Sequence, residues 1–150
     1  MFPGATAEGR LRDLEAWLAR AQEASPGLIL AFVAGACRRG KTARIDRLIE
    51  SGAFIESALA LVEFELPKWK LRRIACDGGT WVCALTKQWN VPDWLSDTAE
   101  FRHESLPLAI LGALVEARRF DEKAGESSSS VPRCPIELSG DAMVCCDNFA

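Results

Sequence analysis

The residues of this 150-residue chain that are best suited to chemistry lie in the octet 35–42. Gly35, Gly40, Lys41 and Thr42 fill every fixed position of the phosphate-loop pattern G-x-x-x-x-G-K-S/T. In a phosphate loop the glycines let backbone N–H groups turn toward an anion, the lysine reaches the outer phosphates, and the hydroxyl holds Mg²⁺. The octet therefore raises the hypothesis of a small nucleotide-binding protein whose ligand is a Mg²⁺-nucleotide.

The segment before the octet argues against that hypothesis. A phosphate loop follows a strand of a parallel sheet, and a second strand supplies an aspartate for the metal. Here Ser25 and Pro26 are typical of an N-cap and a first helical residue, and the next apolar residues have the spacing of a buried helix: Leu28, Ile29, Phe32, Val33 and Ala36. We therefore favour a turn between two helices at the octet, and we expect no cofactor.

A cluster of cations around the octet permits a third hypothesis. Residues 38–47 contain a single acid and five basic residues, which are Arg38, Arg39, Lys41, Arg44 and Arg47. Such a patch could bind nucleic acid, and a second basic group at 68–73 surrounds Trp69, which could stack on a base of a single strand. Charged runs on helices are more often solvated faces, so nucleic acid is a possible partner that we do not favour.

Three further groups of side chains carry reactive atoms. His103, the only histidine, stands beside Glu104 and could act as an acid or a base, but a capping or surface role is the simpler expectation. Cys37 could act as a nucleophile beside the arginines, although a buried apolar role is favoured.

No C-x-x-C pair exists, so we expect free thiols and no metal site. Cys145 and Cys146 lie near the C-terminus, and their role stays open.

Two tryptophans, Trp89 and Trp94, stand at the edges of a loop at 90–96 that contains Pro92. Such a pair could anchor a partner, while packing at the rim of the domain is the commoner role. Because the patterned core shows no paired catalytic residues, we favour a non-enzymatic interaction or regulatory module over an enzyme. Its protein partner is not identified by the sequence.

Composition and charge predict one domain followed by a tail. At 49% apolar residues the chain can build a single core. Residues 1–120 hold 16 basic and 15 acidic residues, whereas residues 121–150 hold 2 and 6, so we expect one domain at 1–120 and a disordered acidic tail at 121–150. The longest apolar run is too short to span a bilayer and no signal-peptide pattern is present, so we expect a cytoplasmic protein with no membrane partner.

The spacing of apolar residues predicts helices before a hairpin, at residues 10–24, 26–36, 42–50 and 54–62. Two strand-like runs, 69–76 and 80–87, enclose Asp77, Gly78 and Gly79, a combination typical of a tight turn. The core face of this hairpin is predicted to carry Ile74, Cys76, Trp81, Cys83 and Leu85, with Cys76 and Cys83 not directly opposite each other.

The final predicted element is a helix that starts after the N-cap Ser105 and ends near Arg119. The expected fold class is therefore α+β. A helical N-terminal half packs with a two-stranded antiparallel hairpin and a C-terminal helix.

Several residues within 66–116 also carry a resemblance, namely residues 69–73, Gly79, Trp81, residues 83–85, residues 92–95, His103 and residues 108–111. They resemble a family of small conserved bacterial proteins that has no known activity. Residues 54–119 also look like small α/β sandwich domains of phage-derived proteins, in which a Trp-rich hairpin precedes an Ala-rich helix. Both resemblances imply a compact α+β unit and transfer no catalytic residues.

Overall fold

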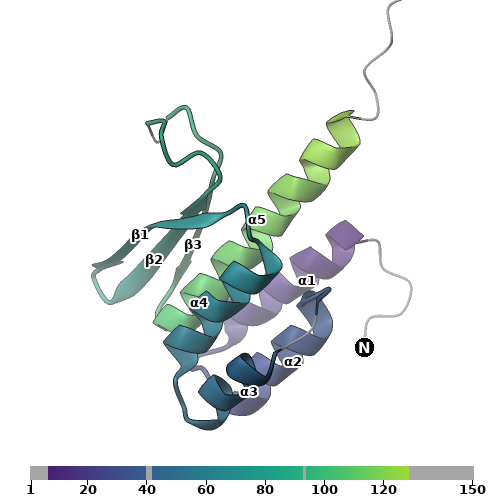
Figure 1. The fold of residues 1–150 in the computed structure, drawn as a ribbon. Helices are drawn as coiled ribbons and strands as arrows, with labels where there is room; N and C mark the ends of the chain where they lie inside the picture. The colour runs from purple at the N-terminus through teal and green to yellow at the C-terminus, as the bar shows by residue number, and fades with distance from the viewer. Residues whose placement is uncertain (1–6, 40–41, 93, 129–150) are drawn as a thin grey trace, which may run out of the picture.

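The structure is a computed structural model that describes residues 7–39, 42–92 and 94–128 (Figure 1). The described residues form five helices and one three-stranded antiparallel sheet, which confirms the α+β fold class. In chain order these elements are α1 (Ala7–Arg20), α2 (Pro26–Ala36), α3 (Ala43–Glu50), α4 (Phe54–Glu65), β1 (Lys70–Asp77), β2 (Thr80–Thr86), β3 (Thr98–His103) and α5 (Leu106–Ser128).

Side-chain caps fix the starts of α2 and α3. The Ser25 hydroxyl accepts a hydrogen bond from the Leu28 N–H at 3.2 Å, and Pro26 opens the helix as predicted. The chain leaves α3 through Gly52, whose φ of 77° lies in the left-handed region that glycine adopts without strain. The predicted helices in this half are confirmed, except that the first one ends at Arg20, before the predicted boundary.

The hairpin also forms as predicted. Gly78 and Gly79 make the turn with φ of 57° and 85°, and Asp77 pairs with Thr80 across it. Four residues of the predicted core face pack on the core: Ile74, Trp81, Cys83 and Leu85. Cys76, the fifth, is exposed, so this part of the prediction is wrong; Cys76 is the next-to-last residue of β1, an edge strand of the sheet. Cys76 pairs with Trp81 and Cys83 with Ile74, so the two cysteines are not opposite each other.

The prediction of a two-stranded sheet is wrong, because β3 adds a third strand to the free edge of β2. The sequence of β3 alternates: Ala99 and His103 are buried, while Glu100 and Arg102 face solvent. This alternation is the usual pattern of a strand with one covered face. The strand is only six residues long.

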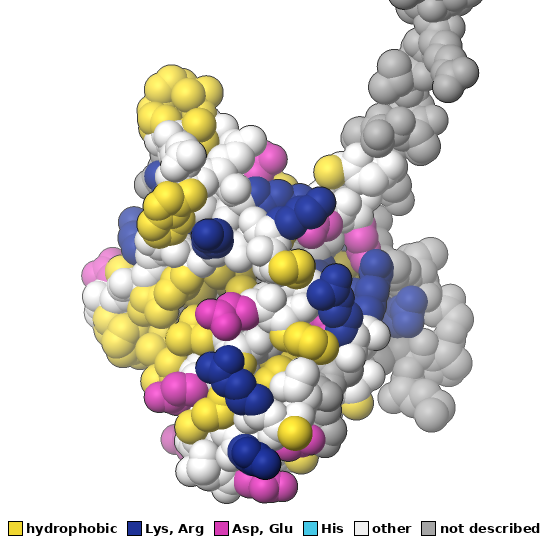
Figure 2. All heavy atoms as spheres, viewed as in Figure 1, with side chains coloured by type: hydrophobic (Ala, Val, Ile, Leu, Met, Phe, Trp, Pro, Cys, Tyr) yellow, Lys and Arg dark blue, Asp and Glu magenta, His cyan; other side chains and the backbone are white. Residues whose placement is uncertain are grey.

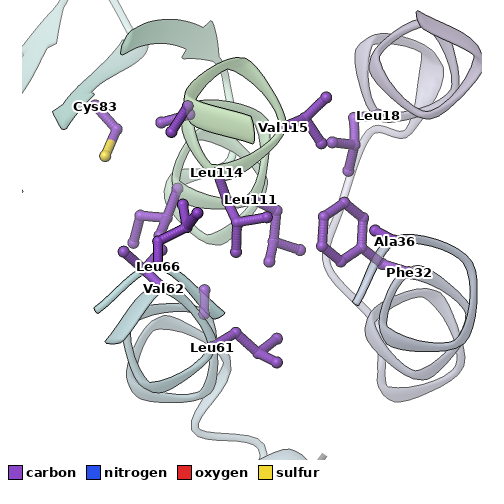
Figure 3. Packing of buried hydrophobic residues seen from close by; sticks show 14 of the residues in the cluster. Leu18, Phe32, Ala36, Leu61, Val62, Leu66, Cys83, Leu111, Leu114 and Val115 are labelled. Carbon is purple, nitrogen blue, oxygen red and sulfur yellow. The ribbon is translucent and has the colours of Figure 1, made fainter. Parts of the chain in front are cut away.

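Helix α5 is the centre of the fold. It packs against the sheet on one side and against α1 and α4 on others, as Figure 1 shows. In Figure 3, Leu111 lies between side chains of α2 and α4, and Val115 faces Leu18 of α1. The fully buried side chains of this helix are Leu108, Ala109, Ile110, Leu111, Ala113, Leu114, Val115 and Ala117. A helix buried around most of its circumference is held by packing rather than by propensity.

The predicted end of α5 near Arg119 is wrong, because the helix continues to Ser128. Residues 121–128 of the predicted tail are therefore helical, and residues 129–150 lie outside the described part of the chain. The extension is supported by contacts of Asp121 with Trp69 and of Glu122 with Arg38. These long-range partners are not visible in the local sequence pattern.

Gly112 lets the sheet approach α5 closely. A Cβ atom built on Gly112 would overlap the ring of Phe101, which β3 places against the helix. Because both residues lie on packed elements, neither backbone can withdraw without disturbing the sheet or the core.

We predict that Gly112→Ala lowers the free energy of unfolding by about 1–3 kcal/mol or more, because the added methyl group forces the Phe101 ring out of its position. Gly125→Ala is the matched control on the same helix, since a Cβ there meets no atom within 4 Å. Removing that glycine should stabilise the protein by up to about 1 kcal/mol. Urea unfolding at constant m-value measures both changes. Equal stabilities of the two variants would show that the close contact is not present.

Candidate functional site

The octet 35–42 begins on a helix rather than after a strand. Gly35 lies in the last turn of α2, and the Cys37 N–H that follows donates to the Val33 carbonyl at 3.1 Å. The Thr42 hydroxyl accepts a hydrogen bond from the Ile45 N–H at 3.4 Å and caps α3. The predicted helix is thus confirmed, and the described residues provide no strand before the octet. Gly40 and Lys41 lie outside the described residues, so nucleotide binding by Gly35, Gly40, Lys41 and Thr42 stays a prediction.

Two backbone amides of the octet bind a carboxylate of the protein itself. The Arg39 N–H donates to Glu65 Oε1 at 2.9 Å, and the Arg38 N–H donates to Glu65 Oε2 at 3.3 Å. Glu65 is the last residue of α4, and the Arg39 side chain donates to the neighbouring Phe64 carbonyl at 3.2 Å. Successive amides that converge on a carboxylate form a small anion-binding nest. The segment after α2 is therefore tied to the end of α4 by charge-assisted hydrogen bonds.

A polar cavity of about 330 Å³ lies beside this nest, between the ends of α2 and α4 and the exposed half of α5. The ionic residues that line it are Arg38, Arg39, Glu65, Arg118, Asp121 and Glu122. Arg38 pairs with Glu122 at 2.9 Å. The described part of α5 thus brings one arginine and two carboxylates to two arginines of the octet.

Arg118 is the most buried of these charges. Its side chain is 9% exposed, and its Nη1 atom has no hydrogen-bond partner within the described structure. Burial lowers the pKa of Arg118, and the nearby positive charge of Arg38 lowers it further, while Glu65 and Glu122 act in the opposite direction. Guanidinium groups stay charged even so, so a positive charge is held at the wall of the cavity.

The thiol of Cys37 is not set up as a nucleophile. Burial raises its pKa to about 12, and the negative charge of Glu65 adds to that effect. Burial alone raises the pKa of the Cys83 thiol to about 12. No group of three or more metal-ligating side chains occurs among the described residues, while Cys145 and Cys146 lie outside them. Cys37 therefore has the half-buried, protonated character expected of a packing residue.

The predicted basic patch is divided between two surroundings. Arg38 and Arg39 are directed toward α5 and α4 by their partners, whereas Arg44 and Arg47 are exposed on α3. Lys41 lies outside the described residues. The exposed positions of the adjacent α4 include two glutamates, Glu56 and Glu63, which would repel a phosphate backbone. Nucleic-acid binding by the patch stays a prediction without support from this arrangement.

The proposed stacking role of Trp69 is wrong, because its side chain is only 3% exposed. The indole N–H donates to Asp121 Oδ2 at 3.1 Å. The ring lies 6.0 Å from that of Phe120, and the Lys87 ammonium lies 5.1 Å from its centroid. Lys87 also pairs with Asp121. Trp69 therefore joins the base of the sheet to α5 and presents no face to a ligand.

His103 has the capping role that the sequence favoured. Its Nδ1 atom accepts a hydrogen bond from the Ser105 N–H at 2.9 Å, just before α5 begins. The side chain is 8% exposed, so it is a buried residue and not a surface one. This bond satisfies a backbone donor at the helix start.

The loop at 87–97, here called the β2–β3 loop, carries the largest exposed apolar side chains. Trp94 is 80% exposed, Leu95 57% and Trp89 55%. Figure 1 shows this loop projecting beyond the end of the sheet, and Figure 2 shows hydrophobic side chains gathered at its tip with Lys and Arg side chains near its base. The two tryptophans that the sequence singled out are thus on one projection, and rim packing is not their role.

The backbone of the β2–β3 loop is held from the sheet. Arg72 is the extra residue of a bulge in β1, and its guanidinium donates to the carbonyls of Val91 at 3.0 Å and Gln88 at 3.4 Å. Thr86 at the end of β2 accepts from the Gln88 N–H at 3.1 Å and donates to the Asp97 carbonyl at 3.3 Å. These hydrogen bonds near both ends of the loop restrict the motion of its backbone.

Comparison of the chain with protein-family models, with curated proteins and with solved structures found no match. The resemblance to small bacterial proteins and the weaker one to phage-type domains therefore stay predictions.

Sequence reasoning missed Glu65, Arg118 and Arg72 as positioning residues. Arg118 had a signal, because it interrupts the apolar stripe of a helix that is otherwise buried. Arg72 had a weaker one, as a cation inside a predicted strand. Glu65 had none, because its partners are 26 and 27 residues away along the chain.

We predict that native protein treated with iodoacetamide at about pH 8 is alkylated at Cys76 at least about tenfold faster than at Cys37 or Cys83. Cys76 is exposed, whereas a thiol with a pKa of about 12 is ionised in roughly one molecule in ten thousand at that pH. Peptide mapping by mass spectrometry measures the three rates, and unfolding in urea should make them similar. Alkylation of native Cys37 at the rate of Cys76 would contradict the burial and pKa of Cys37.

Proposed function

We propose that this chain is a non-enzymatic interaction module that binds a protein partner through the β2–β3 loop. The observation that supports it most is the exposure of Trp94 and Leu95, at 80% and 57%, on a loop whose backbone is held by hydrogen bonds. Tryptophan is the residue type most enriched at the energetic centres of protein interfaces. A single exposed apolar side chain needs no explanation, but three on one projecting loop do.

The hydrogen bonds of the loop add to the affinity that such a surface can reach. Ordering a loop during binding costs free energy, and a loop already ordered in the free protein avoids most of that cost. Arg72 supplies two of the bonds, and the Leu95 and Ser96 N–H groups both donate to the Pro92 carbonyl, at 3.0 and 3.1 Å. The loop is therefore suited to insertion into a pocket of a partner without a large rearrangement.

The charge around the loop indicates the chemistry of the partner. Lys68 and Lys70 are exposed at the start of β1, and Lys70 pairs with Thr86, the residue from which the loop departs. The complementary surface is a protein with an apolar pocket for Trp94 and, at a distance from that pocket, carboxylates that face Lys68 and Lys70.

A protein partner is favoured over a membrane surface. Asp97 lies three residues after Trp94 in the same loop, and its carboxylate opposes contact of the loop with anionic lipid headgroups. No helix within the described ranges is long and apolar enough to cross a bilayer. We also propose a cytoplasmic location, with which the free thiols of Cys37, Cys76 and Cys83, the cysteines among the described residues, are consistent.

Two reactive side chains within the described residues, His103 and Cys37, support a non-enzymatic role. His103 uses Nδ1 to accept a backbone hydrogen bond, and the Cys37 thiol has a pKa of about 12. Neither group has the accessible, activated state that a general base or a nucleophile needs at neutral pH.

Photo-crosslinking from position 94 tests the proposal, with benzoyl-phenylalanine in place of the tryptophan. The crosslinked protein is identified and purified, and its Kd for the uncrosslinked chain is then measured by calorimetry. We predict that Trp94→Ala weakens that affinity at least about tenfold, because the indole is the anchor of the interface. The control Leu30→Ala removes an apolar side chain that is 38% exposed on α2 and should leave the Kd unchanged.

A second variant separates loop order from direct contact. Arg72→Ala removes the bonds to Gln88 and Val91 but leaves Trp94 in place, so it should weaken binding to a smaller extent than Trp94→Ala. An unchanged Kd for Trp94→Ala would refute the proposal. Trp94-dependent binding to phosphatidylserine vesicles would also refute it, because the loop would then bind a membrane. Trp94-dependent self-association in sedimentation would refute it as well, because the loop would then bind a second copy of the chain.

A further inference from the structure

Three arginines and three carboxylates line the cavity beside Glu65, but within the described residues these carboxylates pair with the guanidinium group of only one of those arginines, Arg38. Each carboxylate already has a partner. Glu65 accepts two backbone N–H groups, Glu122 pairs with Arg38, and Asp121 accepts from Trp69 and pairs with Lys87.

Two guanidinium groups on the cavity wall lack a carboxylate partner among the described residues. The Arg39 guanidinium donates to the neutral Phe64 carbonyl, and Arg118 has an Nη1 atom without any hydrogen bond in the described structure. Arg118 is 9% exposed, so water cannot fully replace the missing partner. Burying a guanidinium without an anionic partner costs free energy, because the charge loses its water. An anion that binds there compensates part of that cost, which contributes to its affinity.

We propose that this cavity binds a phosphate group, either as inorganic phosphate or on a small phosphorylated molecule, with Arg118 and Arg39 as its two anchors. Guanidinium groups form paired hydrogen bonds with phosphate oxygens. A phosphate monoester carries a charge of about −1.5 to −2 near neutral pH, which matches two unpaired arginines better than the single charge of a carboxylate does. The volume of about 330 Å³ is at the lower end of the range for small-molecule sites.

This site differs from the nucleotide site suggested by the octet. Its main anchor, Arg118, belongs to α5 and lies outside the octet. The Arg38 and Arg39 amides, which would hold a phosphate in a phosphate loop, remain bound to Glu65. Glu65 therefore acts as a nearby negative charge that opposes the ligand, because like charges at short distance repel.

Calorimetric titration with inorganic phosphate tests the site at constant ionic strength, with chloride as the balancing anion. We predict saturable binding to one site per chain. Arg118→Met should weaken the affinity at least about tenfold, because it removes a charge-assisted pair of hydrogen bonds. Glu65→Gln should strengthen the affinity several-fold, because it removes the opposing charge. Arg47→Ala, which removes an exposed arginine of α3 outside the cavity, should leave the affinity unchanged.

The two cavity variants should change the phosphate affinity in opposite directions and the Arg47 variant should not change it. This pattern distinguishes a specific site from general attraction of phosphate to surface cations. Absence of saturable phosphate binding by the unmodified chain would overturn the proposal, as would an equal loss in Arg118→Met and Arg47→Ala. If circular dichroism shows that Arg118→Met is unfolded, Arg39→Gln takes its place, since Arg39 is exposed, and unchanged affinity in that variant would overturn the proposal. A parallel titration with glycerol 3-phosphate shows whether the ligand is inorganic phosphate or a phosphorylated small molecule. Tighter binding assigns the site to phosphate monoesters, and equal affinity assigns it to inorganic phosphate.

Discussion

The close contact of Phe101 with Gly112 sets the distance between the sheet and α5, and the rest of the fold depends on that distance. Because α5 has no side chain at this point, β3 can lie against it, and the apolar residues of β2 reach the core. The other sides of α5 are covered by α1 and α4, so one helix contacts both halves of the protein. A two-layer domain of this size needs such a shared element to bury enough apolar surface.

The same helix also positions both candidate surfaces. Asp121 holds Trp69 and Lys87 at the base of the β2–β3 loop, while Arg118 and Glu122 face the cavity at the ends of α2 and α4. These three residues of α5 lie within about one helical turn of one another. The loop and the cavity therefore share a rigid support, although each is built from different neighbouring elements.

The sequence predicted what depends on local pattern. Ser25 and Gly52 are local signals, and the helices that they bound are confirmed. The strand β3 was missed because six alternating residues are a short signal. The length of α5 was underestimated because the contacts that support its last turns, such as the Trp69 bond to Asp121, join residues 52 positions apart. The cavity was missed for the same reason, since Glu65 and Arg118 reach the octet only through the tertiary fold.

Binding through the β2–β3 loop depends on the sheet holding this loop in an ordered conformation in the free protein. Backbone ¹⁵N relaxation of residues 88–91 and 94–97 measures that order. We expect order parameters near those of β2, at about 0.85, because Arg72 and Thr86 form hydrogen bonds with the loop near its two ends. Values below about 0.6 across the loop would show that it is flexible on the picosecond to nanosecond timescale and is not an ordered surface in the free protein.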